Sequence, residues 1–154
     1  MRLVLYEPDI PQNAGTLLRL SACLGLGVDL VEPCGFLISD RHLRRAGMDY
    51  LGRAELVRHA SWTAYLETSP AGRLVLLTTR GDIAYPDFAF RPDDRLMVGR
   101  EGGGVPEGVH AAAAARLVVP MVAGVRSLNV AVAAAMVLGE ALRQTGRFPT
   151  EEKG

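Results

Sequence analysis

Residues 116–146 place a short strand, a polar loop and the longest helix candidate of the chain in direct succession. Leu117–Val119 is an apolar run closed by Pro120, which cannot extend a strand because it has no backbone N–H to donate. Residues 130–144 are rich in alanine and apolar on nearly every side, which predicts a buried helix. A chain with this stretch needs a sheet and further helices to enclose it.

The two ends of that helix carry capping signals. Ser127 is the expected N-cap, because its hydroxyl can accept a hydrogen bond from an early backbone N–H. The free amides of a helix start also suit an anion or the polar edge of a ligand. Gly146 is the expected C-cap, with Arg143 and Arg147 near the negative end of the helix dipole. On its own, the pattern fits a capped core helix that binds nothing equally well.

Composition indicates one ordered domain over residues 1–154. Hydrophobic residues make up 49% of the chain and charged residues 22%, which excludes disorder as the default. The formal net charge is zero, so any contact with phosphates must be local. All basic residues except Lys153 are arginines, a bias that genome composition explains more readily than phosphate binding does.

The cysteines, the histidines and the apolar runs of the sequence indicate the cellular compartment of the protein. Cys23 and Cys34 are too few for a disulfide framework, and His42, His59 and His110 lack the spacing of metal ligands. The N-terminus has no signal sequence, and no segment reaches the roughly 18 apolar residues of a membrane span. We therefore expect a soluble, reduced, cytoplasmic protein with no metal and no membrane contact.

The start of the chain predicts a strand followed by a helix. Residues 3–6 are apolar and stop at a loop with two prolines. Asn13 is the expected N-cap of a helix through residues 16–26, ended by Gly25 or Gly27. Arg19 then lies within two turns of that cap, near the carboxyl edge of the sheet where open α/β folds bind ligands. A solvated helix face explains an isolated Arg19 better.

The rest of the chain alternates strands and helices. Strands are predicted at 28–32, 55–58, 73–79 and 95–98, and helices at 40–46, 61–67 and from Pro106 to 115. This alternation predicts an α/β fold with a mostly parallel sheet flanked by helices. Arg41, Arg44 and Arg45 form the strongest basic cluster, which is more often a solvated helix face than a phosphate site.

A glycine-rich segment follows the strand at 95–98. Four glycines surround Glu101 between Gly99 and Gly104, so the backbone can approach a ligand closely. The spacing is neither the dinucleotide-binding GxGxxG nor the triphosphatase GxxxxGK[ST].

Three segments together resemble a known class. LYEPDIPQNAGTLLRLSACLG, LMVGREGGGVPE and VPMVAGVRSLNVAVAAAMVLGEA are similar, in order and spacing, to the three signature motifs of the SPOUT RNA methyltransferases. Within that class, EPDIPQNAG, EPCGF and RHLRRAGMDY resemble the single-domain tRNA 2′-O-methyltransferases that act at the anticodon wobble position. The resemblance runs from about Leu3 to Arg143.

The resemblance implies a fold, an assembly and a cofactor. The fold would contain a C-terminal trefoil knot over roughly residues 73–146, and the protein would be a homodimer. The cofactor would be S-adenosylmethionine, held in the knot. The implied cofactor-binding positions are Leu77, Thr78, Gly99, Glu101, Gly104, Val119, Ser127 and Leu128.

It also implies a reaction, which is methyl transfer to the ribose 2′-hydroxyl of the tRNA wobble nucleotide, a cytidine or modified uridine. A ribose hydroxyl is a poor nucleophile and needs proton removal or charge stabilisation. The matching catalytic position is Arg19, acting as a base or as a clamp on the phosphate that stabilises the alkoxide. Asn13, Glu101, Ser127 and Asn129 would orient the reacting groups, and Arg41, Arg44, Arg45 and Arg126 would contact the tRNA backbone.

The chain also departs from its relatives. Ala131, Val132 and Gly139 replace residues common in the family, which bears on dimer and RNA contacts, and Gly102-Gly103 replaces bulkier residues. The alternatives are a 2′-O-methyltransferase for another tRNA position or for ribosomal RNA, a non-catalytic RNA-binding module on the same fold, and an unrelated nucleotide-binding protein.

Overall fold

The short apolar runs of the sequence become the strands of one sheet. The computed structural model describes residues 1–37, 41, 55–68 and 71–151. Its strands are β1 (Arg2–Tyr6), β2 (Gly27–Val31), β3 (Leu56–His59), β4 (Leu74–Leu77), β5 (Ile83–Ala84), β6 (Arg95–Val98) and β7 (Ala115–Val118). Its helices are α1 (Pro11–Leu24), α3 (Trp62–Thr68), α4 (Glu107–Ala112) and α5 (Val130–Thr145), with a 3-10 helix η1 (Tyr85–Asp87).

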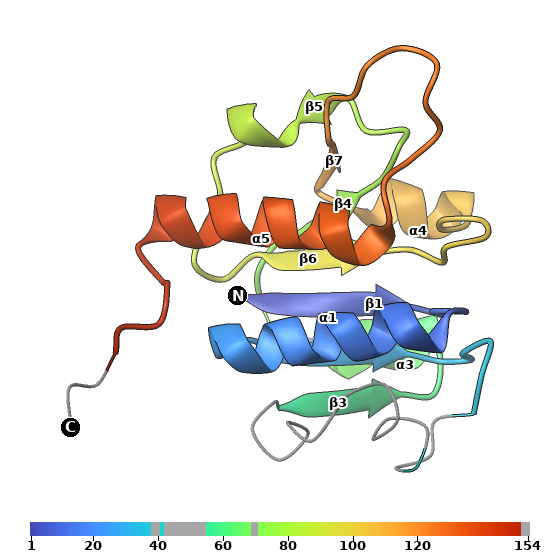
Figure 1. The fold of residues 1–154 in the computed structure, drawn as a ribbon. Helices are drawn as coiled ribbons and strands as arrows, with labels where there is room; N and C mark the ends of the chain where they lie inside the picture. Colours follow the sequence, from blue (N-terminus) through green and yellow to red (C-terminus); the bar gives the residue numbers. More distant parts are fainter. Residues whose placement is uncertain (38–40, 42–54, 69–70, 152–154) are drawn as a thin grey trace.

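The sheet has seven strands in the order β3-β2-β1-β6-β4-β7-β5, and each neighbouring pair is parallel. Helices α1 and α5 pack side by side on one face, where their apolar side chains join a core that includes Leu5, Val75 and Val98 (Figure 1). A second core, on α3 and α4, includes Met97 and the fully buried Tyr65. The α/β fold with a parallel sheet between helices is thus confirmed.

The N-cap predicted at Asn13 is wrong. Helix α1 begins at Pro11, with Ile10 in the cap position. Pro11 starts a helix readily because its φ angle is already helical and its missing N–H would have no partner in the first turn. Asn13 therefore lies inside the first turn, and its amide is available for contacts with other loops. Gly25 ends the helix at φ 66°, one of the two glycines predicted to do so.

The N-cap predicted at Ser127 is also wrong. The side-chain oxygen of Asn129 accepts hydrogen bonds from the backbone N–H groups of Ala131 (2.9 Å) and Val132 (3.3 Å). Because the helix begins at Val130, Asn129 is the residue directly before it and reaches those amides, whereas Ser127 lies two residues further from the helix. Gly146 ends α5 at φ 64°, as predicted.

Strand β7 lies between two strands that are consecutive in the chain, β4 and β5. The connection 78–82 therefore crosses β7, and it does so closely: a Cβ added to Gly81 would lie 2.4 Å from the carbonyl carbon of Leu117. After β7 the chain loops outward through residues 119–129 and returns to α5, which contacts α1, β6 and η1 (Figure 1). This arrangement gathers the ends of β4, β6 and β7 around the start of α5.

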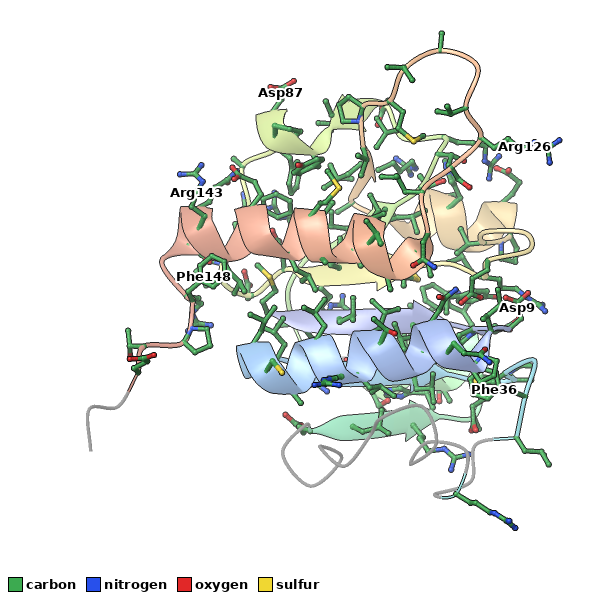
Figure 2. The ribbon with its side chains drawn as sticks, viewed as in Figure 1. Asp9, Phe36, Asp87, Arg126, Arg143 and Phe148 are labelled. Atoms are coloured by element: carbon green, nitrogen blue, oxygen red, sulfur yellow. The ribbon has the colours of Figure 1, made fainter. Side chains whose placement is uncertain are left out.

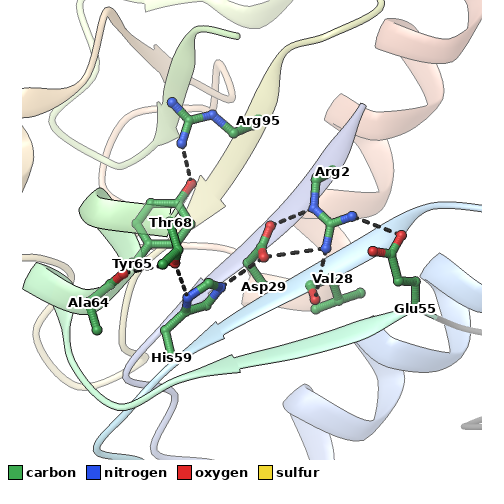
Figure 3. Close-up of polar contacts among 9 residues, drawn as sticks. All are labelled: Arg2, Val28, Asp29, Glu55, His59, Ala64, Tyr65, Thr68 and Arg95. Carbon is green, nitrogen blue, oxygen red and sulfur yellow. Dashed lines mark hydrogen bonds and ion pairs between the residues drawn. The ribbon is translucent and has the colours of Figure 1, made fainter. Parts of the chain in front are cut away.

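A buried polar network joins the first three strands (Figure 3). The Asp29 carboxylate is 2% exposed and binds Arg2 Nε at 2.6 Å and His59 Nε2 at 2.9 Å. The other imidazole nitrogen of His59 lies 3.3 Å from the Thr68 hydroxyl, and Arg2 also pairs with the exposed Glu55. These contacts fix β3 and α3 to the centre of the sheet, on the side away from α1 and α5.

Candidate active site

A pocket of about 570 Å³ opens at the carboxyl ends of β4, β6 and β7. Its walls are the last residues of these strands and those that follow them, the loop leading into α5 with the first turn of that helix, and Ile10 and Asn13 at the start of α1. The carboxyl edge of a parallel sheet is where open α/β folds bind their ligands. The volume lies within the range typical of small-molecule and cofactor sites.

The structure brings most of the predicted site residues to this pocket. Every position that the family resemblance assigned to the cofactor lines it, as do the orienting residues Asn13 and Asn129 and the basic Arg126. The eight cofactor positions are Leu77, Thr78, Gly99, Glu101, Gly104, Val119, Ser127 and Leu128.

The glycine-rich loop forms one wall. The backbones of Arg100 and Gly104 exchange two hydrogen bonds, of 3.0 and 2.9 Å, so the loop folds back on itself. Gly104 has φ 64°, a left-handed angle that favours glycine. A Cβ on Gly99 would lie 2.6 Å from the carbonyl carbon of Gly104. The loop can close only because both residues lack a side chain.

A line of hydrogen bonds connects that loop to α5. Asn13 Nδ2 donates to Glu101 Oε1 at 3.3 Å, and Asn13 Oδ1 accepts from Asn129 Nδ2 at 3.0 Å. Asn129 in turn caps α5. Each amide therefore both donates and accepts, which fixes the orientation of the three side chains relative to one another.

Glu101 is also tied to Asp9, which the sequence did not single out. Asp9 N donates to Glu101 Oε2 at 3.0 Å, and Glu101 N donates to Asp9 Oδ1 at 3.1 Å. Burial, followed by the side-chain interaction with the Asp9 carboxyl group, raises the pKa of Glu101, while the Asp9 backbone N–H acts in the opposite direction. The interaction between the two carboxyl groups lowers the pKa of Asp9, and nearby Arg100 acts in the same direction. Glu101 is thus the first of the two carboxylates to take up a proton.

The predicted catalytic and RNA-binding arginines lie in different places. Arg19 is on the exposed side of α1 and does not line the pocket formed by the described residues. Arg126 lies at the same end of the molecule as Asp9, opposite Arg143 (Figure 2). Arg41 is exposed, and Arg44 and Arg45 lie outside the described residues.

The pocket suits an adenosine-type cofactor. Leu77 and Val119 offer apolar surface at the strand ends, and the loop between Gly99 and Gly104 exposes backbone groups at close range. Among residues 1–37, 41, 55–68 and 71–151, no His, Cys, Asp or Glu side chains cluster as a metal site would require. None of the helices in those ranges has the length and apolar character of a membrane span.

Comparison with known proteins gives this architecture a family. The SpoU rRNA methylase family matches residues 1–139. This chain belongs to the SpoU methylase family. The resemblance noted in the sequence motifs is thereby confirmed. Among solved structures of the family, the S-adenosylmethionine complex of the methyltransferase AviRb from Streptomyces viridochromogenes has a TM-score of 0.84 at 25% identity. The superposed region covers 94% of this chain but only 60% of the AviRb chain.

Other relatives of this SpoU methylase match along nearly their full length. A tRNA (cytidine(34)-2′-O)-methyltransferase from Beijerinckia indica subsp. indica is 62% identical over 146 residues, or 94% of this chain and 91% of the relative. The protein of that name from Escherichia coli K12 is 40% identical over 148 residues, or 95% and 94%. A structure reported for the 2-OH methylation of C/U34 on tRNA has a TM-score of 0.87 at 44% identity, and covers 93% of this chain and 94% of that one.

Proposed function

We propose that this protein transfers a methyl group from S-adenosylmethionine to the ribose 2′-hydroxyl of nucleotide 34 of tRNA, a cytidine or a modified uridine. The observation that carries the proposal is the 62% identity, over 94% of this chain, to a relative named for that reaction. The pocket supports it, because all eight expected cofactor positions converge there. A tRNA substrate would make the protein cytoplasmic.

The relatives favour nucleotide 34 of tRNA over a ribosomal RNA site. The structure reported for the 2-OH methylation of C/U34 on tRNA is 44% identical to this chain and covers 93% of it. The Escherichia coli K12 relative named for cytidine 34 is 40% identical and covers 95% of this chain.

The pocket residues would divide the work of the reaction. S-adenosylmethionine supplies an activated methyl group on a sulfonium. The glycine loop and the apolar ends of β4 and β7 would hold the cofactor. Ser127 and Leu128, in the loop that leads into α5, would close the pocket. The ribose oxygen would take the methyl group, the neutral thioether would leave with the bonding electron pair, and the hydroxyl proton would pass to Arg19 acting as a base or to water. Asn13 and Asn129, fixed by their mutual hydrogen bond, would orient the ribose.

Arg19 would act from the outer side of α1, as a base or as a phosphate clamp that stabilises the forming alkoxide. Its exposed position means that the RNA, or a second copy of the chain, must come to α1 for this role. We expect Arg19→Ala to abolish methyl transfer while calorimetry shows S-adenosylmethionine binding nearly unchanged. A loss of cofactor affinity would reject the assignment.

A homodimer would form through the outer face of α1 and α5. Val132 and Met136 are 51% and 41% exposed one turn apart on α5, although both are large and apolar. Large apolar side chains that stay exposed beside a packed helix are typical of a subunit interface. Light scattering should find wild type dimeric and Met136→Glu monomeric. Leu66→Glu is the matched control, since Leu66 is 50% exposed on α3; a Met136→Glu dimer would exclude this face.

A trefoil knot over roughly residues 73–146 would follow from the position of β7. The connection 78–82 crosses β7, and the chain must then return past that connection to reach α5. Threading of residues 119–146 through the loop between β4 and β6 would satisfy this path.

Four arginines would contact tRNA phosphates: Arg126, and Arg41, Arg44 and Arg45 of the 41–45 cluster. Charge reversal at Arg44 and Arg45 should therefore weaken tRNA binding and flatten its salt dependence.

The deciding experiment is transfer of labelled methyl from S-adenosylmethionine into unmodified tRNA, followed by nuclease mapping of the product. Label on the ribose of nucleotide 34 supports the proposal. Label at another nucleotide keeps the methyltransferase and rejects the wobble position. Absence of label across all tRNA isoacceptors, with the cofactor bound, rejects the proposed reaction.

A further inference from the structure

The loop between Gly99 and Gly104 is short of internal support. Among the described residues, the backbone-to-backbone hydrogen bonds within the loop join its two ends, Arg100 and Gly104, and leave Glu101, Gly102 and Gly103 in between. Glycines lose more conformational freedom on ordering than any other residue. A loop of this composition holds one conformation only if groups outside it bind its backbone.

Asp9 provides that external support. Its carboxylate accepts the backbone N–H of Glu101 at Oδ1, and its own N–H donates to Glu101 Oε2. Gly102 lies against the other carboxylate oxygen, since a Cβ there would be 3.1 Å from Asp9 Oδ2. The two reciprocal bonds fix both the backbone and the side chain of Glu101, in the same way that a capping box fixes a helix start.

Asp9 is in turn fixed by its own surroundings. Arg100 Nε lies 3.8 Å from Asp9 Oδ2 and Arg100 Nη1 lies 3.5 Å from Glu7 Oε2, so one guanidinium offsets both carboxylates. Gly35 packs on the other side, where a Cβ would be 2.7 Å from Asp9 Cβ. Glu7 has φ 41°, a left-handed angle that is unfavourable for a residue with a side chain. Such a turn persists where the surrounding contacts determine it.

We propose that Asp9 is a positioning residue for methyl transfer, which holds the glycine-rich loop and Glu101 in the orientation that Asn13 needs. The proposal rests on the proposed function for its catalytic part. Asp9 acts through Glu101 and Asn13 and touches neither substrate nor cofactor. Substrate binding surfaces outside this line of contacts are unaffected by its loss.

The test compares Asp9→Ala and Asp9→Asn in the full-length protein. Asp9→Ala should lower kcat for tRNA methylation by about tenfold to a hundredfold, the effect of one lost charge-assisted hydrogen bond, with the KM for tRNA within about twofold of wild type. Asp9→Asn keeps an oxygen that can accept the Glu101 N–H, so it should recover most of that loss. Asp87→Ala, an exposed acid on η1 far from Asp9 (Figure 2), should behave as wild type.

Hydrogen exchange gives a readout that does not need the reaction. Asp9→Ala should speed exchange of the amides at residues 101–104 and leave exchange in the strands unchanged. If wild type shows no tRNA methylation, the proposed function fails while the exchange result still tests the loop. Unchanged exchange at 101–104, or faster exchange with unchanged kcat in an active enzyme, overturns the role of Asp9. Asp9→Ser, whose hydroxyl is too short to reach the Glu101 N–H, replaces Asp9→Ala if that variant does not fold.

Discussion

The role of Asn129 can be separated into two parts by substitution. Its side-chain oxygen caps α5, and its amide nitrogen donates to Asn13. Losing the cap costs about 1–2 kcal/mol, and losing the exposed hydrogen bond to Asn13 costs about 0.5–1 kcal/mol. Asn129→Ala should therefore lower the free energy of unfolding by about 1.5–3 kcal/mol, which corresponds to a fall in Tm of roughly 3–12 °C for a chain of this length.

Asn129→Ser distinguishes the two parts. Serine is nearly as good an N-cap as asparagine, so it should restore most of the lost stability. It has no amide to donate to Asn13, so methyl transfer should remain as low as in Asn129→Ala. Urea denaturation at a fixed protein concentration and a single-turnover transfer assay measure the two effects. If Asn129→Ser restored both stability and transfer, Asn129 would be a helix cap only and the orienting role would be refuted.

Three further predictions concern the glycine loop, the buried network and the end of α5. Gly99→Ala should weaken S-adenosylmethionine binding in calorimetry by at least about tenfold, because its Cβ would lie 2.6 Å from the carbonyl carbon of Gly104. Gly108→Ala is the control: its Cβ would have no atom of the described residues within 4 Å, so this variant should bind the cofactor normally. Asp29→Ala should lower the free energy of unfolding by about 3–5 kcal/mol, because it leaves the partly buried Arg2 and the buried His59 without their carboxylate; a loss below about 1 kcal/mol in urea denaturation would contradict this. Hydrogen bonds from its arginine and glutamine neighbours lower the pKa of Glu140 from 4.5 to about 2, so its stabilising contribution is complete above pH 4.5 and disappears as the pH falls through 2. Glu140→Gln should flatten the loss of stability over that interval, and an unchanged pH dependence would rule out the contribution.

Local sequence patterns predicted the elements that depend on neighbouring residues. Each expected strand contains or overlaps an observed strand, because a run of apolar residues bounded by glycine or proline is a local property. The left-handed C-caps at Gly25 and Gly146 follow from single residues. The motif resemblance added the eight pocket positions that spacing alone could not connect.

Patterns failed where a side chain finds its partner elsewhere in the chain. Asn13 was expected to cap α1 and instead bonds to Asn129, 116 residues away. Asp9 looked like part of a rigid loop and instead binds Glu101, 92 residues away. Its acidic type gave no signal, because the partner exists only once β1 and β6 lie side by side.

The sequence by itself determined the strands, the helix ends formed by glycine, and the glycine-rich loop around Glu101, because these depend on backbone preference and on apolar residues at short spacing. Only the tertiary structure decided that β7 lies between β4 and β5, and that Asp9, Glu101, Asn13 and Asn129 form one line of hydrogen bonds. Those bonds join four loops or helix starts, so their geometry is set by the packing of the sheet that carries them.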